Sequence, residues 1–265
     1  MTNIVERIPG YTNSDMLDYC NRLNGIVTKK VDAKVKVGRN IEIVKKPKYK
    51  IDKIISDKLS NSIEYYSRMF DFRPYQLEII DKGIEILRRH RFVYLAMEVR
   101  TGKTLTSFGI ANEMGVKNVL FITKKKAIGS VQDDYDALKP KYEATIINYE
   151  SLHTVVNNEC WDLVICDECH GMGAFAKPNK RALDVKDLIK KFNPYVILLS
   201  GTPTPESYSQ MYHQVYALPN NPFREFANFY RFCDKYVKVK ERKINGLFVK
   251  DYSNGLESIL EAMKP

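Results

Sequence analysis

Unbroken apolar runs alternate along the chain with stretches in which apolar residues recur every three or four positions. The runs predict buried strands, and the helical spacing predicts helices between them. The predicted strands span 92–97, 118–123, 144–148, 163–167 and 196–200. The predicted helices span 74–89, 104–115, the stretch ending at Leu138, and 181–192. This alternation predicts an α/β fold with a parallel sheet, whose ligands bind at the carboxyl ends of the strands.

Different patterns flank this region. Before it, we expect a helix at 11–24, a β-hairpin at 31–43 turning at Gly38–Asn40, and a helix at 51–69. Beyond Pro205, helical stretches are expected at 208–218 and 223–236, then a hairpin at 236–252 turning at Asn245–Gly246, and a helix from 256. The expected organisation is an N-terminal accessory region (1–69), a central lobe (70–235) and a C-terminal extension (236–265).

Charge is concentrated near the N-terminus. The chain has a net charge of +10, from 42 basic and 32 acidic residues among 265. Residues 29–53 hold ten Lys and Arg against three acids, a net charge of +7. This segment is either a solvated lysine face on a small accessory domain or a contact for nucleic acid.

The rest of the composition is that of an ordinary globular protein, with 44% hydrophobic and 28% charged residues. No apolar run approaches the length of a membrane span, and the first residues lack the apolar core of a signal peptide. We therefore expect no membrane association, and a reducing compartment in which the five cysteines are free thiols.

The loop Thr101–Thr104 (TGKT) joins the first predicted strand to a helix, which is the context of a phosphate-binding loop. Backbone N–H groups and the helix dipole would face an anion there. Lys103 would reach the β- and γ-phosphates, and the Thr104 hydroxyl would hold Mg²⁺. Met97 stands where the full pattern GxxxxGK[ST] has its first Gly, so the loop alone leaves chance and nucleotide binding both open.

Asp167 and Glu168 end the apolar strand 163–167. One carboxylate there can hold Mg²⁺ and the other can orient the attacking water, although two acids after a strand also occur in solvated loops. The phosphate-binding loop favours the first interpretation. The same stretch, CDECH at 166–170, matches haem-attachment, redox and zinc patterns, with only Cys160 and His153 near enough in sequence to complete a zinc site. A core thiol is the simpler account of Cys166.

Five motifs together resemble a known family. RPYQ (73–76), TGKT (101–104), INYES (147–151), DECH (167–170) and SGTPT (200–204) occur in the order found in superfamily 2 helicases. Residues 70–235 resemble the first RecA-like lobe of that superfamily, and FRPYQ, INYES and SGTPT are most similar to its Swi/Snf-like branch in phage-encoded forms. The resemblance does not cover the basic N-terminal region.

The resemblance implies a RecA-like parallel sheet flanked by helices, ATP and Mg²⁺ as cofactors, and nucleic acid, most often DNA, as partner. It implies that the chain is the N-terminal, ATP-binding part of an ATP-dependent DNA helicase or translocase. An RNA helicase, and a nucleic-acid-binding or regulatory module without turnover, remain alternatives. The expected compartment is the cytoplasm of a bacterium or a phage-infected cell.

The resemblance also implies roles for individual residues. Those at the nucleotide site are adenine recognition by Arg73 and Gln76; phosphate binding by Thr101, Gly102, Lys103 and Thr104; and catalysis by Lys103, Asp167 and Glu168, with magnesium on Thr104 and Asp167. The remaining roles are coupling by His170, Ser200 and Thr202, and nucleic-acid contacts by Lys124, Lys125, Lys126, Ser130, Asn148 and Tyr149.

The sequence departs from the family in two further places. Arg100 stands where many relatives have Gly, and it either pairs with Glu98 or faces nucleotide or DNA. No second α/β pattern follows Thr204, so a second RecA-like lobe with its arginine finger is expected from a longer chain or from a partner. The 265 residues alone are then expected to be poorly active.

Overall fold

The computed structural model describes residues 30–33, 46–49, 72–155, 160–244 and 247–265. The chain divides into two units, Met1–Ile79 and Ile80–Pro265, and each is described by itself. Helix α3 (Pro74–His90) begins in the first unit and ends in the second.

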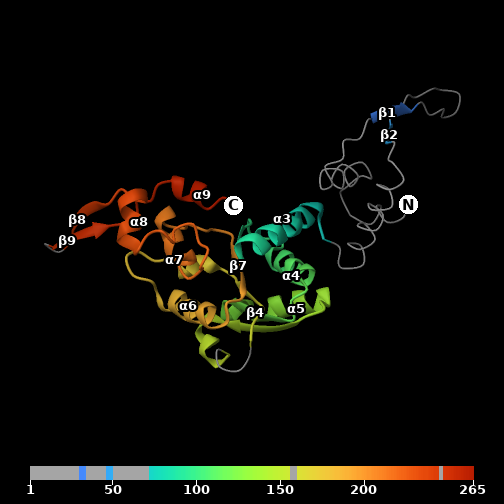
Figure 1. Ribbon diagram of the computed structural model, residues 1–265, viewed down its shortest axis with the longest axis horizontal. Coiled ribbons are helices and arrows are strands. Elements are labelled where there is room, and N and C mark those ends of the chain that lie inside the picture. The colour runs from blue at the N-terminus through green and yellow to red at the C-terminus, as the bar shows by residue number, and fades with distance from the viewer. Residues whose placement is uncertain (1–29, 34–45, 50–71, 156–159, 245–246) are drawn as a thin grey trace. The chain divides into compact units, whose positions relative to one another are not determined.

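A five-stranded parallel sheet forms the centre of the second unit (Figure 1). Its strands lie in the order β3-β7-β6-β4-β5, and every neighbouring pair is parallel. The strands are β3 (Phe92–Ala96), β4 (Asn118–Thr123), β5 (Glu143–Asn148), β6 (Leu163–Cys166) and β7 (Tyr195–Ser200). The predicted α/β fold with a parallel sheet is thus confirmed. All five predicted strands are present, with ends within one residue of those expected.

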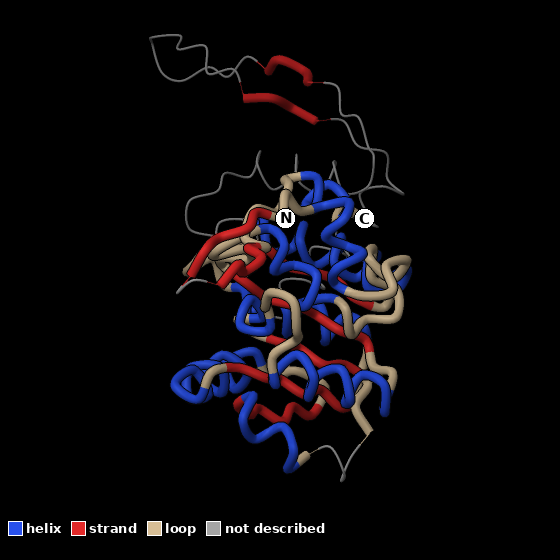
Figure 2. Tube along the Cα trace, turned by 90° about the vertical axis from the view of Figure 1, so that its left-hand side faces the viewer, coloured by secondary structure: helices blue, strands red, loops and turns tan. Residues whose placement is uncertain are grey.

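Both faces of the sheet are buried, and helices lie on either side of it in Figure 2. Even-numbered residues of the inner strands, such as Leu120, Val164 and Leu198, belong to one core cluster together with residues of α6 (Lys180–Phe192), α7 (Met211–Val215) and α8 (Phe229–Tyr236). Because side chains alternate along a strand, the odd-numbered residues face the other way.

The second face packs against the helices that follow β3 and β4. These are α4 (Lys103–Met114) and α5 (Ile128–Leu138). The rings of Phe108 on α4 and Phe121 on β4 lie 5.1 Å apart. Helix α3 approaches α4 closely at Gly83, where a Cβ would lie 2.7 Å from Ile110 Cδ1. Burial on both faces explains why the strands are nearly continuous apolar runs.

The C-terminal part is less helical than its periodicity predicts. The stretch 208–218 forms a short 3₁₀ helix, η5 (Tyr208–Gln210), followed by α7. Of 223–236 only α8 is helical, because the Asn228 side chain caps its start by accepting a hydrogen bond from the Arg231 N–H. Three further 3₁₀ helices were not predicted: η2 (Lys125–Ala127), η3 (Tyr149–Thr154) and η4 (Cys169–Met172).

The expected C-terminal hairpin is present. Strands β8 (Lys240–Ile244) and β9 (Leu247–Asp251) are antiparallel, and α9 (Ser258–Ala262) follows. The expected turn at Asn245–Gly246 lies outside the described residues. Within the described part of the chain, no helix is both long and apolar enough to cross a membrane.

In the first unit, β1 (Lys30–Ala33) pairs with β2 (Lys46–Tyr49) in antiparallel fashion. An antiparallel pair was expected here, but with its second strand at Ile41–Ile43 rather than at 46–49. The expected turn at 38–40 and the helices at 11–24 and 51–69 lie outside the described residues.

Candidate functional site

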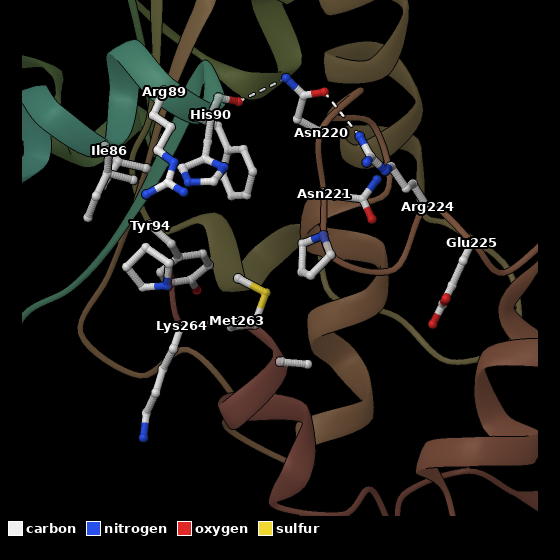
Figure 3. Close-up of a pocket in the computed structure, with 15 residues that line it drawn as sticks. Ile86, Arg89, His90, Tyr94, Asn220, Asn221, Arg224, Glu225, Met263 and Lys264 are labelled. Carbon is white, nitrogen blue, oxygen red and sulfur yellow. Dashed lines mark hydrogen bonds between the residues drawn. The ribbon is translucent and has the colours of Figure 1, made fainter.

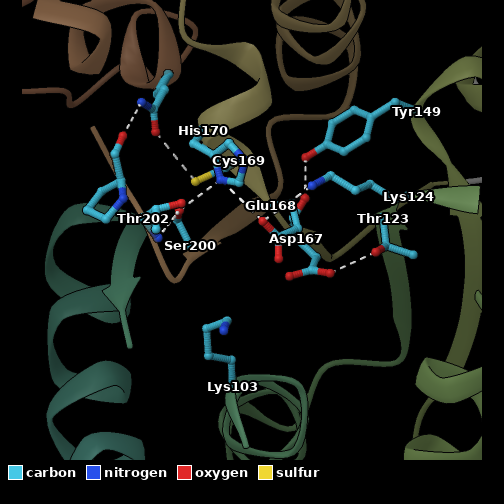
Figure 4. A network of polar contacts seen from close by, with 12 residues as sticks. Lys103, Thr123, Lys124, Tyr149, Asp167, Glu168, Cys169, His170, Ser200 and Thr202 are labelled. Atoms are coloured by element: carbon cyan, nitrogen blue, oxygen red, sulfur yellow. Dashed lines mark hydrogen bonds and ion pairs between the residues drawn. The ribbon is translucent and has the colours of Figure 1, made fainter. Parts of the chain in front are cut away.

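Three segments meet at the carboxyl edge of the parallel sheet: the loop after β3, the turn after β6 and the loop after β7. Because β7 lies between β3 and β6, Ser200–Thr202 separates the phosphate-binding loop from the carboxylates. Figure 4 shows Lys103, at the start of α4, pointing toward Ser200 and Asp167. Lys103 and Asp167, two of the predicted catalytic residues, therefore lie near each other although they are 64 positions apart in sequence.

The loop Thr101–Thr104 leads directly into α4. Gly102 has the left-handed backbone conformation (φ 78°) that favours glycine, and its carbonyl accepts the N–H of Thr106 at 2.9 Å. The preceding turn is closed by Thr101, whose hydroxyl donates to the carbonyl of Glu98 at 2.7 Å. The first N–H groups of a helix have no partner within it, so those of α4 point out of its N-terminus toward the carboxyl edge of the sheet. This end of α4 is suited to an anion.

Lys103 lies across the loop from β7. Its Nζ donates to the carbonyl of Glu98 at 3.4 Å. A Cβ added at Gly201 would lie 3.5 Å from this Nζ and 3.1 Å from Val99 Cγ2. A side chain at Gly201 would therefore be tight against Val99 and in contact with the ammonium group. The glycine of SGTPT thus lies next to the lysine of TGKT in space.

Asp167 is a buried carboxylate, with 8% of the residue exposed. The Thr123 hydroxyl, at the end of β4, donates to Asp167 Oδ2 at 2.7 Å. Burial raises the pKa of Asp167 above its ordinary value, while the Thr123 hydrogen bond and the positive charge of Lys103 act in the opposite direction. The Tyr149 hydroxyl donates to the backbone carbonyl of Asp167 at 2.7 Å. This second hydrogen bond holds the backbone of the turn after β6, while the Thr123 bond holds the side chain.

Glu168 connects three neighbouring groups. Its backbone is left-handed (φ 51°), a conformation uncommon for a non-glycine residue, and it directs the side chain to Lys124 and His170. Glu168 Oε2 lies 3.6 Å from Lys124 Nζ and 3.2 Å from His170 Nδ1. This carboxylate therefore connects the loop after β4 to the turn after β6.

His170 extends the network to β7. Its Nδ1 lies 3.1 Å from Ser200 Oγ, and Ser200 Oγ in turn accepts the N–H of Thr202 at 3.1 Å. Burial lowers the pKa of His170, so the ring is favoured in its neutral form. The three residues expected to act in coupling are thus in one chain of contacts, which begins at Glu168.

The cysteines of CDECH lie in the core. Cys166 and Cys169 are free thiols with no exposed surface, and burial raises the pKa of Cys166 to about 12. The Cys169 thiol donates to Gln214 Oε1 at 3.7 Å. Within the described ranges, no group of three or more His, Cys, Asp and Glu side chains is placed to hold a metal ion.

The expected nucleic-acid contacts are not all at the surface. Lys124, Lys125, Lys126 and Ser130 are exposed at the start of η2 and α5. Asn148 is partly exposed and donates its amide to Glu150. Tyr149, in contrast, is 2% exposed, so its side chain is a support of the carboxylate turn and not a contact for a phosphate backbone. The cause is η3, which turns Tyr149 inward immediately after β5.

Arg73 and Gln76 belong to the first unit. Gln76 is buried, and its side-chain oxygen accepts the backbone N–H of Arg73 at 2.9 Å, which caps the start of α3. The adenine role of both residues stays a prediction. Arg100 is exposed, has a left-handed backbone (φ 68°) and makes no ion pair with Glu98.

Thr123 and Gly201 were not singled out in the sequence. Their signals were present but weak: a polar residue ending the apolar strand NVLFIT, and a glycine directly after VILLS. The sequence does not show which residues lie next to them: Asp167 is the neighbour of Thr123, and Lys103 is the neighbour of Gly201.

A separate hollow of about 680 Å³ lies at the other end of β3 (Figure 3). It is lined by the end of α3, including Arg89 and His90, by the loop 220–225 and by the last residues of the chain, including Lys264. Asn220 donates to the carbonyl of His90 at 3.3 Å across one side of it. Because Phe92 and Val93 line it, this hollow lies away from the loop that follows the carboxyl end of β3.

Comparison with known proteins gives the following matches. Residues 69–157, less than half of the chain, match the family model described as "type III restriction enzyme, res subunit". No curated protein matches.

Solved structures match part of this chain, and the first of them is similar to it in fold. The Sulfolobus solfataricus SWI2/SNF2 ATPase core in complex with dsDNA matches with a TM-score of 0.52 and 17% identity, over 62% of this chain and 38% of that chain. The ATPase core domain from the same organism matches with a TM-score of 0.49 and 18% identity, over 62% and 37%. The type ISP restriction-modification enzyme LlaBIII bound to DNA matches with 0.36 and 14%, over 49% and 12%. This chain thus spans well under half the length of these solved chains.

Proposed function

We infer that this chain, which carries the RecA-like lobe of a superfamily 2 helicase or ATPase, is the ATP-binding part of an ATP-dependent DNA translocase or helicase. One observation carries the proposal: Lys103 at the start of α4 points toward Asp167, one of the two carboxylates after β6, at the carboxyl edge of one sheet. That arrangement suits a nucleoside triphosphate, with phosphates toward α4 and the attacking water toward β6.

Phosphate binding would fall to the N-terminus of α4 and to Lys103. The left-handed Gly102 allows the backbone to turn its N–H groups toward the anion. Among the described residues, the hydrogen-bond partner of Lys103 Nζ is a neutral carbonyl, the oxygen of Glu98 at 3.4 Å. The positive charge of Lys103 is therefore available for the β- and γ-phosphates.

A magnesium ion suits the two residues assigned to it. Asp167 is a buried carboxylate whose pKa is raised by burial, which means that its negative charge is incompletely compensated by the protein. A carboxylate and the hydroxyl of Thr104 are hard oxygen ligands of the kind Mg²⁺ prefers. When bound, the ion would neutralise charge on the β- and γ-phosphates. Thr123 would hold Asp167 in place for this role.

Hydrolysis would depend on Glu168. A carboxylate next to the γ-phosphate can orient the attacking water and accept its proton. Its ion pair with Lys124 and its contact with His170 fix its direction. They also make the position of the catalytic carboxylate depend on the loop that begins at Lys124.

Coupling to nucleic acid would use the ion pair between Lys124 and Glu168. Lys124 contacts Glu168 and is followed by the exposed Lys125 and Lys126, so a phosphate backbone that draws Lys124 away would change the surroundings of Glu168. On the other side, the contact of His170 with Ser200 would transmit changes at the γ-phosphate to the segment after β7. DNA is preferred as the nucleic acid because the similar SWI2/SNF2 core is described in complex with dsDNA.

The test is steady-state ATPase activity of the full-length protein with duplex DNA, single-stranded DNA and RNA. Stimulation of the ATPase activity by DNA supports the proposal. A protein of the Swi/Snf-like branch should be stimulated more by duplex DNA than by single-stranded DNA. Stimulation by RNA alone would identify an RNA helicase. Nucleotide binding without turnover under all three conditions would identify a regulatory module that keeps the fold.

A further inference from the structure

The hairpin β8–β9 carries a basic and apolar surface that the nucleotide site does not use. It lies beyond α8 at the far end of the second unit in Figure 1. Residues 238–251, here called the basic hairpin, contain five Lys and Arg against two acids, a net charge of +3. Such a charge density on two short strands favours a polyanion.

The apolar residues of the basic hairpin are unusually exposed. Leu247, Phe248 and Val249 have 72%, 73% and 45% of their surface exposed. In the ladder, Lys243 lies opposite Phe248 and Arg242 lies opposite Val249, so the two faces of the ribbon each combine a cation with an apolar side chain. Three consecutive apolar residues open to water on an isolated ribbon indicate a contact surface.

The cations of the basic hairpin divide into two groups. Arg242 pairs with Asp251 at 2.7 Å, and Asp251 also accepts hydrogen bonds from Ser253, which hold its pKa below the usual range. Lys238, Lys240, Lys243 and Lys250 make no ion pair with any described residue, although Lys243 Nζ lies 5.8 Å from the Phe248 ring. The three lysines on the paired strands, Lys240, Lys243 and Lys250, are available for an external anion.

The base of the basic hairpin is firmly anchored. Ser209 Oγ donates to the carbonyl of Tyr252 at 2.6 Å, and Ser207 Oγ accepts the N–H of Gly255 at 3.1 Å. A Cβ at Gly255 would lie 2.4 Å from the backbone N of Ser209, so only glycine allows this approach. The anchoring residues follow Thr202 closely in sequence, which connects the hairpin to the loop at the nucleotide site.

We propose that the basic hairpin is a nucleic-acid contact that docks into a groove of duplex DNA, with Lys240, Lys243 and Lys250 on phosphates and Phe248 against the bases or sugars. The major groove admits a two-stranded ribbon of this width. Lysine–phosphate contacts would supply salt-dependent affinity, and an exposed aromatic ring would add apolar contact. The inference rests on the proposed function, because it requires that the protein act on DNA.

The experiment is fluorescence anisotropy of the 265-residue chain with a short labelled duplex, across roughly 50–200 mM salt. The triple variant K240Q/K243Q/K250Q should weaken binding and lower the salt slope by about 0.9 for each lysine–phosphate pair that the substitutions remove. The matched control K177Q/K180Q/K190Q removes the same charge from exposed lysines elsewhere and should leave the slope near that of the wild type. F248A should weaken binding by roughly ten-fold without changing the slope.

The outcomes separate this inference from the proposed function. If the wild type binds duplex and the hairpin variant matches the lysine control, the hairpin contact is wrong while a DNA-dependent ATPase remains. If the wild type does not bind duplex at any salt concentration, the hairpin contact is overturned, and the ATPase measurement on the full-length protein decides the proposed function separately. Unchanged DNA binding together with loss of a self-associated species in F248A, measured by sedimentation, would instead assign the surface to a second copy of the chain.

Discussion

The hydroxyl of Thr123 donates a hydrogen bond to Asp167 Oδ2 at 2.7 Å, and both side chains are buried. Thr123 ends β4 and Asp167 directly follows the neighbouring strand β6, and the two residues are 44 positions apart in sequence. The bond stabilises the ionised form of a carboxyl whose burial raises its pKa. It therefore opposes the effect of burial and favours the charged form of Asp167.

Replacing Thr123 with Val should raise the pKa of Asp167 further, because the isosteric side chain removes a donor to the carboxylate. Nucleotide–Mg²⁺ binding requires the charged form, so its loss on acidification should begin at a higher pH in the variant. The buried carboxylate left without its donor should also cost about 1–3 kcal/mol of stability at neutral pH. Calorimetric titration of ATP–Mg²⁺ across pH measures the first effect. T123S, which keeps the hydroxyl, should behave like the wild type, and equal pH profiles for all three proteins would contradict this role.

Lys103→Ala should abolish tight ATP–Mg²⁺ binding while the fold is retained. The side chain donates to the carbonyl of Glu98 and is not part of the core, so its removal costs little stability. Hydrogen bonds to charged groups contribute about 1.5–3 kcal/mol, so affinity should fall at least ten-fold. Isothermal titration calorimetry measures the affinity, and K190A is a suitable control. Wild-type affinity in K103A would remove Lys103 from the site.

The inner strands of the sheet were predictable from the sequence because β4, β6 and β7 are buried on both faces and are therefore almost unbroken apolar runs. The loop Thr101–Thr104 and the pair Asp167–Glu168 were predictable because they end such runs. The order of strands was not predictable, and Thr123 gains its role only because β4 lies beside β6. Tyr149 was assigned to the surface because no periodicity shows that η3 turns it inward. The second strand of the N-terminal pair was misplaced for a similar reason: alternation marked Ile41–Ile43, whereas the register pairs β1 with 46–49.

Glu168→Gln should leave ATP binding nearly intact and lower turnover of the full-length protein by roughly 10²–10⁴. The amide keeps the shape of the side chain but cannot accept a proton from water. It also loses the ion pair with Lys124, so nucleic-acid affinity should not decrease. Single-turnover hydrolysis separates the chemical step from binding. Turnover at the wild-type rate would move the catalytic role to another residue.

His213 should make the chain sensitive to mild acid. Its ring stacks on Phe229 at 5.1 Å, with Tyr212 and Tyr216 at its edges, and burial lowers its pKa to about 4. Because the folded state binds the proton only at a lower pH than the unfolded chain, stability falls as pH drops from about 6.5 to about 4. The loss from this residue should reach about 3 kcal/mol at the lower limit. Urea unfolding of wild type and H213F should give curves that diverge in this window, with the exposed H153N as control. A difference between wild type and H213F that is constant with pH would contradict this assignment.

The 265-residue chain alone should bind nucleotide but hydrolyse it slowly, even with duplex DNA present. Phosphoryl transfer leaves little covalent work for the protein, so its rate depends on positioning and on stabilising the transferred charge. Lys103, Asp167 and Glu168 all lie at the carboxyl edge of one sheet, and they would contact a bound nucleotide from one side only. An arginine finger from the opposite side contributes about 10³–10⁵ in rate where it is present. Arg100 is a nearby cation, but it lies in the phosphate-binding loop itself, with a strained left-handed backbone.

The measurement is steady-state ATPase activity over a range of protein concentration, with R100G as a variant that relieves the backbone strain and removes the cation. A DNA-stimulated rate of about 1 s⁻¹ or more that is independent of concentration would show that the lobe is complete by itself. A rate that rises with concentration would mean that a second copy of the chain supplies the missing cation.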